Sequence, residues 1–167
     1  MGISVTGSPT EQIEENWDGS ETVYSATYRM LLRVAYLLTG SAPAAEDVVH
    51  DVVCSVGPRL AKLDNPPAYL RTAVVNRCRS LHRRTVRSPS PDMVVDVVID
   101  PGLTELRTEL MRLSTKRRTA VVLRYLCDLS YAQIAEEMEC REATARSLVQ
   151  RGLSDLRMIL TTGASPS

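Results

Sequence analysis

Apolar residues recur at helical spacing through most of the chain, beginning in its N-terminal third. Leu31, Val34 and Leu38 follow a period close to 3.6, the repeat of an amphipathic helix. Gly40 marks the end of this helix, because glycine is favoured just beyond a helix C-terminus. Residues 1–21 lack such a period and are predicted to form a flexible N-terminal tail.

Two more helices are expected in the first half. Ser41 can cap the second one, which is predicted to run to about Leu60 and to bury a row of valines. Asp64-Asn65-Pro66-Pro67 is a break, since prolines interrupt helices. A third helix is predicted over residues 67–84, and its apolar face consists of Leu70, Val74, Cys78 and Leu81.

A break in the pattern separates this half from the rest of the chain. Ser88-Pro89-Ser90-Pro91 cannot be helical, and the valine-rich stretch 93–99 has no second strand to pair with. Residues 85–102 are therefore predicted to form a flexible acidic linker, with three aspartates and no base after residue 91. Further helices are expected at about 103–113, 115–127, 130–138 and 141–160, followed by a tail over 161–167.

The pattern as a whole predicts an all-α fold. Two small helical domains, residues 22–84 and 103–160, are joined by the linker. A length of 167 residues suits one medium domain or two small ones.

The segment 129–153 is typical of a helix-turn-helix. Ser130 caps its first helix, and Gln133 completes a capping box. After a short turn, a second helix buries Ala145 and Val149. The opposite face suits the major groove of DNA because it combines short polar side chains with arginines. A plain helical hairpin with a solvated face is the alternative. The candidate DNA-reading residues are Arg141, Thr144, Arg146, Ser147, Gln150 and Arg151.

Charge is concentrated in one block, although the chain as a whole has no net charge. Six arginines and no acidic residue lie within residues 65–91, which points to a polyanionic partner. Tyr69 precedes them and could stack on an unpaired base. Asn76 either reads a base or bonds to a neighbouring helix. For the arginine block as a whole, the alternative is an ordinary solvated helix face.

An acidic group, Glu46, Asp47 and Asp51, lies on the exposed side of the second helix. Acids early in a helix are favoured by its dipole, so this explanation stands beside a role in binding a partner. His50 and Cys54 would share a helix face and could supply half a metal site, but two further ligands are not evident, and no metal is expected.

Several classes of protein are excluded by what the sequence lacks. No stretch approaches the length of a membrane span, and no secretory signal opens the chain, so the protein is expected in the cytoplasm. No nucleophile–base pair, phosphate-binding loop or paired catalytic carboxylates are recognisable, so neither an enzyme nor a cofactor is expected. The four cysteines form no Cys-x-x-Cys pair.

Both halves, in this order, resemble the extracytoplasmic-function (ECF) group of the bacterial sigma-70 family. Residues 35–51 and 68–78 are similar to the family's second conserved region. Leu123-Arg124-Tyr125, the stretch 128–135 and Arg151-Gly152-Leu153 are similar to the fourth. The ending Gln-Arg-Gly-Leu is similar to a mainly actinobacterial subgroup. The pairing is specific, because single helix-turn-helix regulators lack the first half.

The resemblance implies a subunit that binds core RNA polymerase, through its β and β′ subunits, and directs promoter-specific initiation. Family members often bind an anti-sigma factor as well. The linker would pass through the active-site cleft, and the helix-turn-helix would read the −35 element. The resemblance places Glu46, Asp47, His50 and Asp51 on the β′ clamp helices. It assigns capture and melting of the −10 element to Tyr69, Arg71, Asn76, Arg77, Arg79 and Arg83.

Departures from the family pattern and two competing functions remain open. His50 stands where the family usually has glutamine, and Leu148 stands where a basic residue is frequent. Leu148 is expected either to shift promoter choice or to pack inward. The first competing function is a stand-alone helix-turn-helix regulator. The second is a protein that binds polymerase or an anti-sigma factor without starting transcription.

Overall fold

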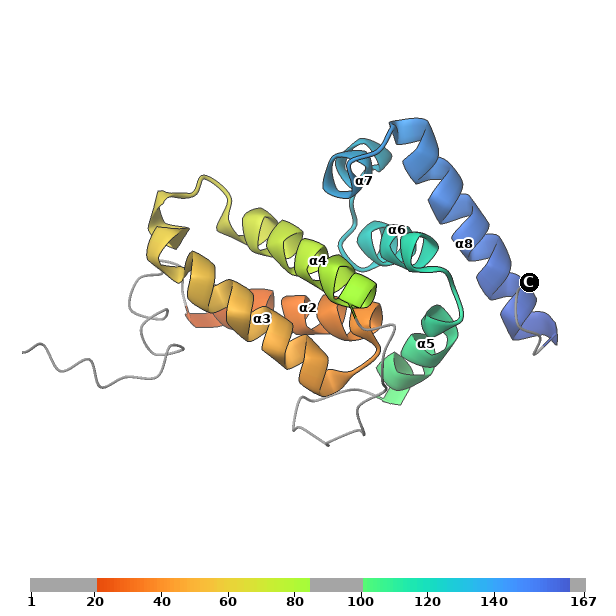
Figure 1. The fold of residues 1–167 in the computed structure, drawn as a ribbon, viewed down its shortest axis with the longest axis horizontal. Coiled ribbons are helices and arrows are strands. Elements are labelled where there is room, and N and C mark those ends of the chain that lie inside the picture. The colour runs from red at the N-terminus through yellow and green to blue at the C-terminus, as the bar shows by residue number, and fades with distance from the viewer. Residues whose placement is uncertain (1–20, 85–100, 163–167) are drawn as a thin grey trace, which may run out of the picture.

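The computed structural model describes residues 21–84 and 101–162. These ranges contain seven α-helices, one 3-10 helix and no strand, which confirms the all-α fold. Residues 1–20, 85–100 and 163–167 of the predicted tails and linker lie outside the described residues. Glu21, Thr161 and Thr162 were predicted to belong to the tails, but they are helical. Figure 1 shows α2, α3 and α4 as one group of helices and α5 to α8 as a second group, with α6 lying beside α4.

The first group consists of α2 (Glu21–Thr39), α3 (Ala42–Val56) and α4 (Pro66–Arg84), which pack on one another. Gly40 ends α2 with a φ of 76°, and its N–H donates to the Tyr36 carbonyl at 2.8 Å. The Ser41 hydroxyl accepts from the Ala44 N–H at 3.4 Å, so the predicted cap of α3 is confirmed. Val34 and Val49 are fully buried in this group.

The predicted end of the second helix is wrong. Helix α3 stops at Val56, and the 3-10 helix η1 (Gly57–Lys62) continues the chain. Pro58 is the reason, because a proline inside an α-helix removes a backbone donor and its ring clashes with the preceding turn. Leu60 is still buried, so η1 packs against the same core.

The second group consists of α5 (Pro101–Met111), α6 (Thr115–Tyr125), α7 (Tyr131–Met138) and α8 (Glu142–Thr162). The linker was predicted to extend through Gly102, but Pro101 and Gly102 form the first turn of α5. Proline suits this place because its missing N–H would have no partner in the first turn of a helix.

The two groups share one hydrophobic core, which α2 and α4 join to α5 and α6. Gly40 lies against Met111 across this junction, and a Cβ at Gly40 would lie 2.7 Å from the Met111 Sδ. The left-handed φ and the close approach both require glycine there. Within residues 21–84 and 101–162, no helix is long and apolar enough to cross a membrane.

Candidate nucleic-acid interface

Helices α7 and α8 form the predicted helix-turn-helix. The Ser130 hydroxyl accepts from the Gln133 N–H at 3.2 Å, and the Gln133 side chain accepts from the Ser130 N–H at 2.9 Å, which confirms the capping box. Glu139 ends α7 in the left-handed conformation with a φ of 53°. The turn therefore directs the chain sharply into α8.

The faces of α8 separate as the pattern predicted. Ala145 and Val149 are fully buried against the other helices. Ser147 is half-buried at the edge of the opposite face. The remaining residues predicted to read DNA are all exposed: Arg141, Thr144, Arg146, Gln150 and Arg151.

Leu148 is half-buried and packs against the hydrophobic core. Its position matches the alternative in which Leu148 packs inward. Gly152, one turn later, lies against α6, where a Cβ would approach the Val121 Cγ2 to 2.7 Å. Both residues thus serve the contact between α8 and its neighbours.

Tyr131 organises two arginines beside the recognition helix. The guanidinium of Arg146 lies 5.0 Å from the centroid of its ring, and that of Arg124 lies 5.4 Å from it. Arg146 also pairs with Glu142 at 3.2 Å, and Arg124 donates to the Leu129 carbonyl at 2.9 Å. Sequence reasoning did not assign Arg124 or Tyr131 to the site, although both lie in the quoted motifs.

The six residues predicted for the −10 element divide into two groups on α4. Tyr69 is 48% exposed, and Asn76 and Arg77 are also exposed. Arg77 pairs with Asp51 of α3 at 3.1 Å. Arg71 and Arg79 instead turn toward α7, and the side chain of Arg83 lies outside the described residues.

Arg71 and Arg79, which turn toward α7, both donate to Glu137 of that helix. Its Oε1 accepts from Arg71 Nε and from the Thr72 hydroxyl, each at 3.0 Å, and its backbone carbonyl accepts from Arg79 Nη1 at 3.4 Å. Sequence reasoning missed Glu137, which stands in a run of polar residues and looks solvated. No local spacing links it to Arg71.

The acidic group lies along one side of α3. Asp47, His50 and Asp51 are exposed, whereas Glu46 is half-buried, and burial together with the nearby charge of Asp47 raises the pKa of Glu46. The first turn of α3 contains no acidic residue. Because the dipole effect fades beyond the first turn, the helix dipole does not explain this group.

His50 and Cys54 lie together as predicted, with the His50 Nε2 and the Cys54 Sγ 3.5 Å apart. Among the described residues, however, no group of three histidine, cysteine or acidic side chains could hold a metal ion. The pair therefore remains a contact within one helix.

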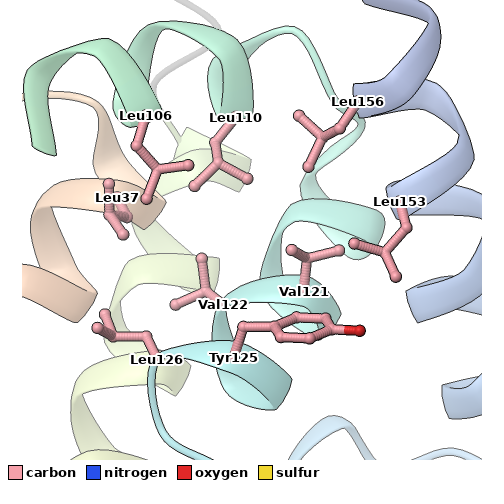
Figure 2. Close-up of a pocket in the computed structure, with 9 residues that line it drawn as sticks. All are labelled: Leu37, Leu106, Leu110, Val121, Val122, Tyr125, Leu126, Leu153 and Leu156. Atoms are coloured by element: carbon pink, nitrogen blue, oxygen red, sulfur yellow. The ribbon is translucent and has the colours of Figure 1, made fainter. Parts of the chain in front are cut away.

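An apolar groove of about 270 Å³ lies where the two groups of helices meet. Figure 2 shows side chains from α2, α5, α6 and α8 pointing into the same space. Tyr125 and Leu106 are exposed at this surface despite their size. The lining residues are Leu37, Leu106, Leu110, Val121, Val122, Tyr125, Leu126, Leu153 and Leu156.

Comparison with solved structures identifies the fold. The sigma factor RpoE of Bartonella quintana, solved in complex with the anti-sigma factor NepR, superimposes with a TM-score of 0.70 at 22% identity, covering 86% of this chain and 98% of that one. The extracytoplasmic function sigma factor SigJ of Mycobacterium tuberculosis gives a TM-score of 0.62 at 26% identity, covering 80% of this chain and 51% of that one.

Comparison of sequences identifies the family. The chain is 30% identical over 146 residues to the ECF RNA polymerase sigma factor SigJ of Mycobacterium tuberculosis, which corresponds to 77% of this chain and 47% of that protein. The chain thus spans about half the length of this relative. Residues 23–88 match the model of Sigma-70 region 2, and residues 103–156 match that of Sigma-70, region 4. With both regions present in family order over most of its length, the chain belongs to the sigma-70 family of sigma factors.

Proposed function

We propose that this chain is a promoter-specificity subunit of bacterial RNA polymerase, which binds the core enzyme and directs initiation at promoters with matching −35 and −10 elements. One observation carries this proposal: a helix-turn-helix with an exposed polar face and an arginine-bearing helix α4 occur in the same chain. A stand-alone regulator would need only the first of these.

The −35 element is assigned to α8. Its exposed face combines small side chains, which permit close approach to base edges, with arginines that bind guanine or phosphate. Arg146 is held in place by Glu142 and by the ring of Tyr131, so its guanidinium is partly ordered before DNA arrives. The assigned residues are Arg141, Thr144, Arg146, Ser147, Gln150 and Arg151.

The −10 element is assigned to α4. Tyr69 offers an exposed ring for stacking on an unpaired base, and Asn76 and Arg77 lie exposed further along the helix. Arg71, Arg79 and Arg83 complete the assignment. Arg71 and Arg79 become available to DNA only when their contacts with α7 are released.

We assign the binding of core polymerase to Glu46, Asp47, His50 and Asp51 on α3. The helix dipole does not explain the negative charge of the three acidic residues in this group. The apolar groove fits the apolar side of a helix from a protein partner, either polymerase or an anti-sigma factor. We propose a cytoplasmic location, because core polymerase and promoter DNA are the proposed partners. We also propose residues 22–84 and 103–160 as its two domains.

A run-off transcription assay with core polymerase, with and without this chain, tests the function. The proposal expects polymerase-dependent products from a subset of genomic promoters only when the chain is present. If core polymerase binds the chain but opens no promoter, a non-initiating interaction protein is the better interpretation. Tight operator binding by a dimer without polymerase, seen by gel shift and size-exclusion chromatography, would favour the stand-alone regulator.

A further inference from the structure

Glu137 accepts hydrogen bonds from three residues of α4 across the junction between the two groups of helices. Its side chain is 7% exposed, and that of Arg71 is 16% exposed. Arg71 and Thr72 converge on a single carboxylate oxygen, and Arg79 reaches the Glu137 backbone. An acid of the helix-turn-helix therefore occupies the arginine side of α4.

Burial of the Glu137 carboxylate and the Arg71 guanidinium costs desolvation free energy, so this ion pair is a poor way to stabilise packing between helices. A buried ion pair gains little over apolar packing unless every polar atom is satisfied. The second carboxylate oxygen of Glu137, Oε2, is buried and has no hydrogen-bond partner among the described residues. Stability alone therefore gives a weak reason for a glutamate at this position.

Two other contacts across the junction are also polar. The Arg107 Nε donates to the Gly40 carbonyl at 2.6 Å, and Arg118 Nη1 donates to the Leu38 carbonyl at 2.9 Å. Both carbonyls lie at the C-terminal end of α2, where the helix dipole favours cations. Arg118 is 3% exposed, and its buried Nε has no hydrogen-bond partner in the part of the chain that the structure describes. Water can replace such contacts when the two groups separate.

We propose that Glu137 is an internal ligand that competes with promoter DNA for Arg71. A guanidinium binds a carboxylate and a phosphate through the same donors, so Arg71 cannot serve both at once. In the closed arrangement Arg71 and Thr72 hold Glu137. In the open arrangement Arg71 turns to the DNA backbone. This inference rests on the proposed function for the identity of the competing phosphate.

The closed arrangement lowers DNA affinity in a specific way. Glu137 belongs to α7, which leads directly into the recognition helix α8, so its release from α4 frees both proposed DNA-binding helices to move apart. A partner that separates the two groups of helices therefore releases Arg71 from Glu137 and leaves it free to bind DNA. The substitution Glu137→Gln removes the charge while keeping the size of the side chain.

The first experiment measures opening without DNA or polymerase. Hydrogen exchange of α4 and α7 and small-angle scattering are recorded for the full chain, for Glu137→Gln and for Glu136→Gln. Glu136 is the exposed neighbour on the same helix, so its variant matches the change in charge. We expect faster exchange and a larger radius of gyration only for Glu137→Gln. Equal values for the two variants would overturn the inference.

The second experiment measures competition. Binding of a single-stranded thymidine oligonucleotide, which supplies the phosphate backbone that Arg71 would contact, is compared for the same variants by fluorescence anisotropy. We expect Glu137→Gln to bind about fivefold or more tightly than Glu136→Gln, the lower end of ordinary coupling between sites. Faster exchange with unchanged DNA affinity would show a purely structural contact and would also overturn the inference.

A second variant, Thr72→Val, tests the same inference in case Glu137→Gln fails to fold. Thr72→Val removes a hydroxyl whose single hydrogen is shared between the Glu137 Oε1 and the Ala68 carbonyl, each 3.0 Å away, and leaves every residue assigned to DNA in place. It should shift exchange and affinity in the same direction as Glu137→Gln, to a smaller extent, with an unchanged circular dichroism spectrum. A shift in the opposite direction would contradict the inference. Failure of the run-off assay leaves the exchange measurement intact, so the two proposals fail separately.

Discussion

Gly152 of α8 lies so close to Val121 of α6 that a Cβ would come within 2.7 Å of the valine Cγ2. We expect Gly152→Ala to lower the free energy of unfolding by about 1 to 3 kcal/mol, because the overpacking outweighs the better helix propensity of alanine. Urea denaturation measures this change. Ser154→Ala, at an exposed position on the same helix, is the control. The double variant Gly152→Ala/Val121→Ala should lose less stability than the sum of the losses of the two single variants. A loss equal to that sum would contradict the steric explanation.

Arg118 should be a stabilising residue in spite of its charge. Burial lowers its pKa, but it donates to the carbonyls of Leu38 and Leu113, at 2.9 and 3.2 Å. Arg118→Met would leave both carbonyls without this donor, at a cost of about 2 kcal/mol in the free energy of unfolding. Lys116→Met, at an exposed position two residues earlier in α6, is the control in urea denaturation. A gain in stability for Arg118→Met would show that desolvation of the guanidinium dominates.

Arg151 should contribute to reading of the −35 element. Loss of one arginine contact to a base costs about 1 to 3 kcal/mol, so Arg151→Ala should reduce run-off transcription from a cognate promoter by about fivefold or more. The reduction should shrink when the −35 sequence is scrambled. Arg157→Ala, exposed further along α8, should transcribe like the unmodified chain. Unchanged promoter preference in both Arg151→Ala and Arg146→Ala would argue that α8 is not the reader.

Charge reversal on α3 should weaken binding to core polymerase. Asp47 is exposed, and the helix dipole does not account for it, so Asp47→Lys should change little in folding and much in association. Asp51→Lys should act in the same direction and would also break the pair with Arg77. A pull-down on core polymerase measures the effect, with Glu136→Lys as the matched charge reversal on α7. Wild-type affinity in both α3 variants would remove this surface from the polymerase interface.

The four cysteines should react with alkylating agents at very different rates. Burial raises the pKa of Cys78 to about 12 and that of Cys127 to about 11. At pH 8 the thiolate fraction of Cys127 is then about one in a thousand, and that of Cys78 is about tenfold lower. Cys54, Cys127 and Cys140 are all half-buried, but burial of the Cys127 thiol raises its pKa, so Cys54 and Cys140 should be labelled first. Mass spectrometry after brief iodoacetamide treatment follows each site, and early labelling of Cys78 would show that α4 opens from the core.

Local chemistry was enough to predict most of the helices. The capping box at Ser130 and Gln133, the stop at Gly40 and the helical period of the apolar residues each depend on neighbours within a few positions. The buried and exposed faces of α8 follow from the same period. Errors arose where proline acts in a way that depends on position, ending α3 before Pro58 and starting α5 at Pro101.

The sequence by itself therefore determined the helices, their order and the family, because these depend on short-range spacing and on motifs within each half. Only the tertiary structure decided that Arg71 faces Glu137, 66 residues away, and that Arg118 reaches the Leu38 carbonyl, 80 residues away. It also showed that Gly40 makes room for Met111. The physical reason is that these contacts form between helix faces whose relative placement depends on the packed core of both halves, and no local period encodes that placement.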